Sequence, residues 1–171
     1  SIEFKDVKIP KKNLLGKENH GFIYIMEAIN EGRVEIANQA VGLARGAYDR
    51  AVLHARTREQ FGQKIGKFQN IAHMIVEMSE NIESAALLAY KAAWTFDKGK
   101  LDLATAHQAK VKCPLVAIDV CLKSMQILAG QGLFEEQFLP SYLGDSLATW
   151  LLEGTGQIQR NTVAAQILGR L

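Results

Sequence analysis

One carboxylate stands out near the end of the chain, in the stretch LLEGTGQIQRN at residues 151–161. Glu153 follows an apolar run and precedes a Gly-Thr-Gly turn, with no basic residue beside it. An apolar setting suits a carboxylate to take up a proton, so Glu153 is a candidate general base. The glycine-rich turn would let backbone N–H groups approach a ligand closely. The alternative is that Glu153 only stabilises the N-terminus of the helix that follows.

A second polar cluster lies at residues 56–70, RTREQFGQKIGKFQN. It links two segments with helical patterns and gathers arginine, lysine and glutamine donors around two phenylalanines and a glycine. Fork-shaped donors in this number are typical of a site that binds a phosphate or pyrophosphate. The alternative that composition leaves open is a hydrophilic turn with two aromatic anchors.

Other kinds of site are poorly supported by the residue patterns. No Glu-x-x-His motif precedes any histidine, so the di-metal centre of some helical bundles is not expected and no metal site is predicted. Neither a Gly-x-Ser-x-Gly elbow nor a Gly-x-Gly-x-x-Gly loop after a strand is present. Cys113 and Cys121 fall in one predicted helix, about 12 Å apart along its axis, which is too far for a disulfide. They are interpreted as core residues of a reduced intracellular protein.

The composition is ordinary for one compact soluble domain: of 171 residues, 48% are hydrophobic and 22% are charged. The net charge of +2 is spread along the chain, which gives no support for nucleic-acid binding. No apolar run approaches the ~18 residues that span a bilayer, so no integral membrane segment is expected.

Helical patterns dominate after residue 20. Apolar residues recur at steps of three and four from about residue 21 to 57, which predicts one long helix. Further helices are expected over residues 68–98, 102–128 and 155–168, with a short piece around 140–150. The predicted fold class is all-α, an up-and-down four-helix-type bundle with long helices, preceded by a short extended β segment. In the third helix, Pro114 predicts a kink or a locally broken ladder.

Two further expectations concern what lies outside the bundle. The alternation of apolar residues from Ile2 to Ile9 predicts an extended segment, and a single strand needs a sheet to pair with. Because no later segment resembles a partner strand, we expect the chain to be the C-terminal part of a longer protein. Small residues on the first long helix would also allow it to pack against a second subunit; these are Gly42, Ala44, Gly46 and Ala47.

The order of these pieces resembles the C-terminal helical domain of the flavin-dependent acyl-CoA dehydrogenases. FKDVKIPKKNLLGKENHGF is similar to the end of that family's middle β-domain, and EGRVEIANQAVGLARGAYDRAVLHARTREQFGQKIGKFQN to its first bundle helix and Arg-x-x-Phe-Gly turn. MQILAGQG resembles the Gln-Ile-x-Gly-Gly-x-Gly segment, and EGTGQIQRN the Glu-Gly-Thr-x-Gln-Ile-Gln-Arg signature. The resemblance implies that residues 1–19 end a middle β-domain with its linker and that residues 20–171 form a C-terminal helical bundle domain.

The resemblance also implies a reaction, the α,β-dehydrogenation of an acyl-CoA thioester to a trans-2-enoyl-CoA. In this family a carboxylate removes the α-proton, the β-hydride passes to N5 of FAD, and an electron-transferring flavoprotein usually reoxidises the flavin. Glu153 occupies the base position, and its backbone N–H would help to hold the thioester carbonyl. Some relatives carry the base at the position of Gly32 instead, so the neighbouring Glu31 keeps a second assignment open.

By the same resemblance, three segments contact FAD: the turn after the first helix, on the FAD of a neighbouring subunit, the end of the third helix, on the adenylate end, and the residues after Glu153. The implied cofactor-binding residues are Arg58, Glu59, Gln60, Phe68, Gln69, Gln126, Ile127, Leu128, Ala129, Gly130, Thr155, Gly156 and Gln157. The implied substrate-binding residues are Asn30, Glu31, Gly32, Arg33 and Gly154.

The chain departs from the family pattern in two places, which leaves the acyl substrate open. Ala129-Gly130-Gln131-Gly132 replaces Gly-Gly-x-Gly, and Gly144-Asp145 stands where relatives commonly read Arg-Asp. The alternative functions are a non-catalytic assembly or binding subunit of this family and a bare oligomeric bundle. The expected partners are an acyl-CoA, an electron-transferring flavoprotein and further copies of the chain, as a dimer or tetramer. The expected location is the cytoplasm, or the mitochondrial matrix in a eukaryote.

Overall fold

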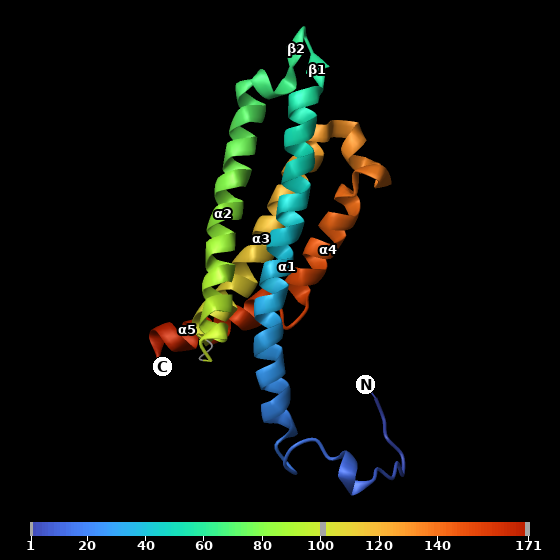
Figure 1. Cartoon of the computed structure of the whole chain (residues 1–171), viewed down its shortest axis with the longest axis vertical. Coiled ribbons are helices and arrows are strands. Elements are labelled where there is room, and N and C mark those ends of the chain that lie inside the picture. The colour runs from blue at the N-terminus through green and yellow to red at the C-terminus, as the bar shows by residue number, and fades with distance from the viewer. Residues whose placement is uncertain (1, 100–101, 170–171) are drawn as a thin grey trace.

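A computed structural model describes residues 2–99 and 102–169 of the chain (Figure 1). Residues 1, 100–101 and 170–171, which fall inside the predicted domain ranges, lie outside the described residues. The described part contains five α-helices, namely α1 (Gly21–Thr57), α2 (Gln69–Asp97), α3 (Leu103–Leu128), α4 (Leu139–Leu151) and α5 (Gly156–Leu168). The all-α fold class is therefore confirmed.

Short elements join the helices. The link from α1 to α2 is an antiparallel hairpin, β1 (Glu59–Gln60) and β2 (Gln63–Lys64), in which Glu59 pairs with Lys64 and Gln60 with Gln63. Single turns of 3-10 helix make up the remaining elements: η1 (Lys11–Asn13), η2 (Ile65–Lys67), η3 (Ala129–Leu133) and η4 (Glu135–Gln137).

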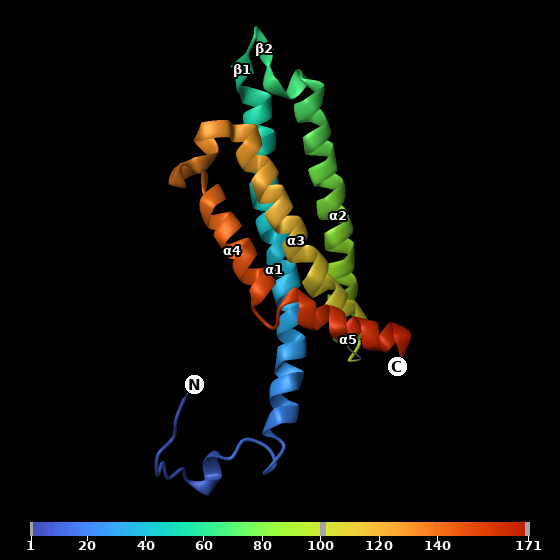
Figure 2. The same cartoon turned by 180° about the vertical axis from the view of Figure 1, so that it is seen from behind.

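The four helices that pack side by side, α1 to α4, alternate in direction. In Figure 1, α1 and α3 run upward while α2 and α4 run downward, and α5 crosses the lower end of the bundle. Figure 2 shows the same arrangement from behind, with α3 lying across α1 and α4 and α2 on either side of it. The up-and-down arrangement is the predicted one, but its fourth helix is α4, which was expected only as a short piece. The last helix, α5, was expected in the bundle and instead crosses beneath α3.

The helix boundaries lie within one residue of those expected for every long helix. Asp102 caps α3, since its carboxylate accepts a hydrogen bond from the Thr105 N–H at 3.3 Å. Gly99 follows α2 with a φ of +71°, the left-handed conformation that glycine adopts after a helix end. The helical residues of α3 continue through Pro114. The ladder is locally broken there, as expected, because the proline nitrogen cannot donate to the carbonyl one turn earlier.

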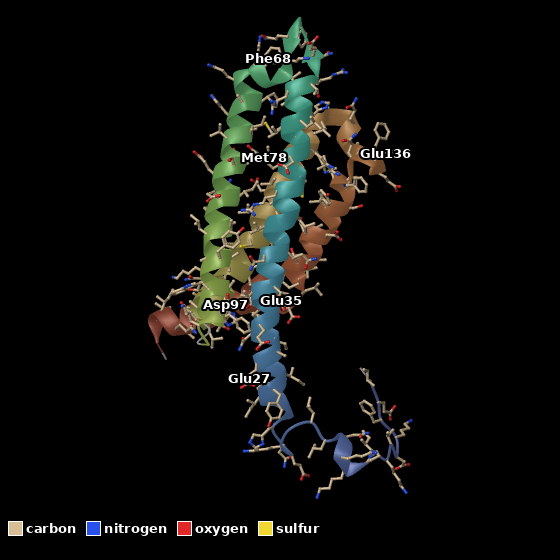
Figure 3. The ribbon with its side chains drawn as sticks, viewed as in Figure 1. Glu27, Glu35, Phe68, Met78, Asp97 and Glu136 are labelled. Atoms are coloured by element: carbon tan, nitrogen blue, oxygen red, sulfur yellow. The ribbon has the colours of Figure 1, made fainter. Side chains whose placement is uncertain are left out.

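The core is built mainly from alanine. On α1 the buried line runs from Ala37 to Ala55 at steps of three and four, and it faces further buried alanines on α2 and α3. Small side chains let helix axes approach closely, so larger residues such as Met78 enter only where space remains. Met78 projects from α2 toward α1 (Figure 3) and is fully buried. Gly46 faces this interior too, because a Cβ there would lie 3.0 Å from the Tyr142 ring of α4.

The predicted apolar stripe on α1 is only partly buried. Ala40, Ala47 and Ala51 lie in the core, but Ile25 is 60% exposed. The reason is visible in Figure 1, where the first part of α1 extends below the bundle and meets no other helix. Residues 2–10 form neither helix nor strand and are exposed, so within the described chain their predicted β character has no sheet to pair with.

One described segment is long and apolar enough to cross a membrane by length and composition alone. It covers α3 and η3, from Leu103 to Leu133, whereas the sequence analysis expects no such run. Half of its apolar window is buried inside the bundle, as in the core helix of a water-soluble fold.

Candidate active site

The loop between α4 and α5 carries Glu153 in an unusual backbone conformation. Glu153 has a φ of +54° and Gly154 a φ of +94°, so two successive residues are left-handed. A residue with a Cβ adopts this region at a cost of about 1–2 kcal/mol. The two residues turn the chain sharply from the end of α4 into α5, whose N-cap is Thr155. Contacts elsewhere must hold Glu153 in this strained conformation.

The Glu153 carboxyl group lies against α1 at Gly32. A Cβ placed on Gly32 would lie 3.2 Å from both the carboxyl carbon and Oε1 of Glu153. Any larger residue at this position would therefore have to displace the carboxylate. Residue 32 is thus a glycine because the carboxyl group of Glu153 occupies the space next to it.

Glu31 does not share this position. Consecutive helical residues are turned by about 100°, so Glu31 projects from another face of α1. It is exposed and lines a separate pocket of ≈ 420 Å³ with Glu27, Asn30 and residues Phe96, Gly99 and Leu103. Of the two candidate bases, Glu153 is therefore the one that meets Gly32.

Buried polar side chains bind the backbone carbonyls of this loop. Gln159 Nε2 donates to the carbonyls of Glu153 at 2.8 Å and Gly154 at 3.1 Å. Arg33 Nε donates to the Glu153 carbonyl at 3.3 Å, and its Nη1 donates to Asn30 Oδ1. The loop is thus held through its main chain, and in the described part of the chain these bonds to Glu153 end on its carbonyl and not on its carboxylate.

Two residues of α3 complete this polar group, and sequence reasoning missed both. Lys110 is fully buried, and its Nζ donates to the carbonyls of Trp150 at 3.2 Å and Gly154 at 3.4 Å. Burial, with Arg33 nearby, lowers the pKa of Lys110 to about 8, although Glu153 acts in the opposite direction. The ring of His107 bonds Gln159 Oε1 through Nδ1, and burial lowers the His107 pKa.

A signal for these residues did exist in the sequence. His107 and Lys110 are three residues apart on the face of α3 that otherwise carries alanine and cysteine. Polar residues on a buried helix face need partners. Gln159 was quoted within the Glu-Gly-Thr signature but received no role, because one sequence does not show which of its glutamines turns inward.

The other end of α1 carries a second site. A pocket of ≈ 560 Å³ lies between the end of α1, the hairpin and η3. It is lined by His54, Arg58, Gln60, Ile65, Ile127, Leu128, Ala129, Gly130, Gln131 and Phe134. The turn with Arg58 and the segment 127–130 lie far apart along the chain, and both are predicted to contact FAD. They meet in this pocket. The pKa of His54 is lowered, mainly by burial and also by the positive charge of Arg58.

Not every predicted residue of this group lines the pocket. Glu59 pairs with Lys64 at 2.7 Å on the hairpin surface, as expected for a solvated ion pair. Phe68 caps α2 and packs edge-on against Phe61, with ring centroids 6.2 Å apart (Figure 3). Gln69 and Gln126 are exposed. The pocket thus gathers Arg58, Gln60 and the 127–130 segment, and these four residues lie outside it.

Thr155, Gly156 and Gln157, which follow Glu153 in the chain, form a third group of predicted residues. Thr155 and Gln157 are exposed, whereas Gly156 is buried because a Cβ there would lie 2.8 Å from Trp150 Nε1. Thr155 makes no side-chain cap, so the first N–H groups of α5 remain free for an acceptor. Trp150 Nε1 is a buried donor without a partner among the described residues.

The two sites are well separated along one chain. Gly32 and Arg58 lie roughly 26 residues apart on α1, or ~39 Å along its axis. The Glu153 loop, which lies against Gly32, is therefore far from the pocket at Arg58 within a single chain.

Comparisons with known proteins agree with this geometry. The family described as "Acyl-CoA dehydrogenase, C-terminal domain" matches residues 19–168. The short-chain specific acyl-CoA dehydrogenase of Clostridium acetobutylicum is 36% identical over 166 residues, covering 97% of this chain. The caffeyl-CoA reductase-Etf complex subunit CarC of Acetobacterium woodii is 37% identical over 167 residues, covering 98%. The chain spans 44% of the length of each relative.

The fold is similar to solved structures over almost its whole length. The butyryl-CoA dehydrogenase from Megasphaera elsdenii superposes with a TM-score of 0.93 at 36% sequence identity. That match covers 96% of this chain and 43% of the solved one.

Proposed function

The chain belongs to the acyl-CoA dehydrogenase family, and on that premise we propose that it forms the C-terminal helical domain of an FAD-dependent acyl-CoA dehydrogenase. The proposed reaction is the α,β-dehydrogenation of an acyl-CoA thioester to a trans-2-enoyl-CoA. The observation that carries the proposal is the place of the Glu153 carboxyl group, against α1 where Gly32 has no side chain. Arg33 and Gln159 bind the carbonyl of Glu153, which leaves its carboxylate available to accept a proton.

In the proposed reaction, Glu153 takes up a proton from the α-carbon of the thioester. The electron pair of that C–H bond forms the double bond as the β-hydrogen leaves as a hydride. Bound FAD would supply the acceptor for this hydride. The Glu153 N–H would donate to the thioester carbonyl and stabilise the enolate-like charge that develops on it. Gly154, next in the chain, would allow close approach of the substrate because it has no side chain.

For the cofactor we propose two half-sites. Thr155, Gly156 and Gln157 would contact FAD beside Glu153, where the free N–H groups of α5 suit an acceptor-rich ligand. The pocket with Arg58 and Gln60 would receive a different FAD molecule, held by a second copy of the chain. Gly32, beside Glu153, and Arg58 lie ~39 Å apart along α1, which supports this division. The contacts proposed for Glu59, Phe68, Gln69 and Gln126 stay predictions from the family resemblance.

The partners follow from the same proposal. A second copy of the chain would complete each FAD site, so a dimer or tetramer is expected. An electron-transferring flavoprotein is the proposed oxidant of the reduced cofactor, supported by the name of the related complex subunit. A short acyl-CoA is the substrate to assay first, since the Clostridium relative is named short-chain specific. Location in the cytoplasm, or in the mitochondrial matrix of a eukaryote, stays a prediction.

The test replaces Glu153 with glutamine, which keeps the size of the side chain and removes the base. The full-length FAD-loaded protein is mixed anaerobically with butyryl-CoA, and the loss of flavin absorbance is followed. Removal of the base should slow bleaching about 10²- to 10⁴-fold while flavin stays bound. The matched control, Glu31→Gln, should bleach at the wild-type rate.

Other outcomes are equally informative. Unchanged bleaching in Glu153→Gln would contradict the base assignment, and loss of bleaching in Glu31→Gln would move the role to Glu31. If the flavin absorbance of the wild-type protein persisted with every acyl-CoA tried, a role as a non-catalytic binding or assembly subunit would be favoured instead.

A further inference from the structure

Lys110 is a buried cation that the reaction itself does not use. It lies on α3 with none of its surface exposed, and its ammonium donates to the carbonyls of Trp150 and Gly154. Building on the proposed function, we propose that Lys110 is a positioning residue: it closes the turn between α4 and α5 and so sets the Glu153 carboxylate against Gly32.

The two acceptors lie on opposite sides of the turn. Trp150 belongs to the last turn of α4, whose final carbonyls have no partner within the helix. Gly154 lies beyond Glu153 and is the second of the two left-handed residues. One ammonium group therefore ties the end of α4 to the far side of Glu153. Loss of this tie would free the loop to relax from its strained conformation.

Lys110 differs in this respect from the other residues that bind the loop. Gln159 binds the carbonyls of Glu153 and Gly154, and Arg33 binds that of Glu153. Neither reaches α4. Among the described residues, Lys110 is the one that binds both α4 and the loop. It therefore fixes the start of the loop as well as its end.

Burial of a lysine lowers the stability of the fold if the side chain serves only to fill space. Taking an ammonium group out of water carries a large desolvation cost, and a hydrophobic residue of similar volume is often more stable in such a site. Here the cation lies at the C-terminal end of α4, where the helix dipole favours positive charge and offsets part of the cost. The lowered pKa of Lys110, to about 8, agrees with a cost that is only partly offset. A role in placing Glu153 accounts for the remainder.

The test is Lys110→Met in the full-length FAD-loaded protein, which keeps the apolar stem and removes the ammonium. We expect FAD content and the KM for butyryl-CoA to stay near wild type, while kcat falls about 10- to 100-fold, the size of effect that a misplaced reacting group produces. Peptides covering residues 150–158 should exchange their amide hydrogens faster. Lys112→Met, an exposed lysine on the same helix, should change neither kcat nor exchange.

The outcomes separate this proposal from the proposed function. An unchanged kcat in Lys110→Met, beside a wild type that bleaches, would overturn the positioning role alone. A fall in kcat without faster exchange would also overturn it, because the charge and not the position would then be the cause. A wild type that fails to bleach with any acyl-CoA overturns both, since no base remains to be positioned.

If Lys110→Met does not fold, the pH dependence of the bleaching rate constant in the wild-type protein tests the proposal instead. Loss of the ammonium proton leaves two N–H donors but removes the charge that strengthens both hydrogen bonds, so the loop should be held less firmly and the bleaching rate constant should fall above about pH 8. The charged groups that act on Lys110 are Arg33 from α1 and Glu153 from the loop, and His107 lies three residues away on the same helix. Burial lowers the His107 pKa from its ordinary 6.5, so His107 titrates on the acid side. A rate constant that stays level to pH 10 would overturn the proposal.

Discussion

The two ends of α1 differ in how completely one chain builds them. At the Gly32 end, the Glu153 loop is enclosed by α1, α3 and α5, and buried side chains satisfy its carbonyls. At the Arg58 end, the donors line an open pocket beside an exposed hairpin. The first end thus has a geometry fixed within the chain, whereas the second presents groups for a ligand that comes from elsewhere. Under the proposed function, proton transfer and one FAD contact belong to the first end, and the contact with the FAD of a second copy belongs to the other.

Apart from removal of the base itself, the largest effect is expected from Gly32→Ala at the enclosed end. The added Cβ would lie 3.2 Å from the Glu153 carboxyl carbon, so the carboxylate has to shift by a few tenths of an ångström or more. Displacement of a catalytic group on this scale should lower the bleaching rate constant by as much as about 100-fold. Gly42→Ala is the matched control, because a Cβ there meets nothing within 4 Å. Equal rates in the two variants would show that the enclosed end tolerates a displaced base.

At the open end, Arg58→Ala should act on the cofactor and not on the chemistry. A hydrogen bond to a charged group contributes about 1.5–3 kcal/mol, so the Kd for FAD should rise at least tenfold. The flavin that remains bound should bleach at the wild-type rate, since Arg58 lies ~39 Å from Gly32 in the same chain. Arg56→Ala, an exposed arginine outside the pocket, should retain FAD. Slower bleaching in fully loaded Arg58→Ala would contradict the division of roles.

The contrast between the ends also shows what the sequence could predict. The bounds of α1 and α5 were predictable because apolar periodicity and glycine mark them locally. The meeting of Arg58 with the 127–130 segment was expected only through the family resemblance, since no local pattern joins them. Lys110 was missed because a lysine looks like a surface residue until its helix face is known to be buried.

Two other differences concern apolar residues that nothing in the described part of the chain covers. Ile25 fits the helical stripe but is exposed, because the first part of α1 extends beyond the bundle. A periodic pattern identifies the face that is to be covered and does not identify the covering surface. The same limit applies to the exposed segment at residues 2–10, whose apolar alternation has no partner here.

The buried lysine predicts a pH dependence of stability at the enclosed end. Its pKa is about 8 in the folded chain and near 10.4 when unfolded, so between these values the unfolded state binds more protons. The free energy of unfolding therefore rises with pH, by about 1 kcal/mol from pH 8 to pH 9. The buried Cys113 thiol, with a pKa raised to about 12, acts in the opposite direction.

Comparison with Lys110→Met isolates the lysine, because the cysteine and all other groups are common to both proteins. Urea unfolding at pH 7, 8, 9 and 10 should show the wild type gaining stability relative to the variant as pH rises. A difference that is independent of pH would mean that Lys110 keeps its ordinary pKa in the fold.

The smallest effect is expected at Ala129, and it separates two kinds of strain. Ala129 and Glu153 both have left-handed φ values, +51° and +54°, one at each end of α1. Arg33 and Gln159 hold Glu153 through its carbonyl, so its strain is maintained by buried bonds. Ala129 is exposed at the rim of the open pocket, at a position where the family pattern has glycine.

Ala129→Gly should therefore relieve strain without a functional cost, raising the free energy of unfolding by about 1 kcal/mol and leaving FAD affinity unchanged. Ala148→Gly, on an exposed face of α4, is the matched control and should lower stability by about 0.5–1 kcal/mol, as glycine does inside a helix. Thermal unfolding of both variants measures the pair of opposite shifts. A stabilised Ala129→Gly that bound FAD more weakly would mean that the strained alanine shapes the pocket, and that the open end is more preorganised than its exposure indicates.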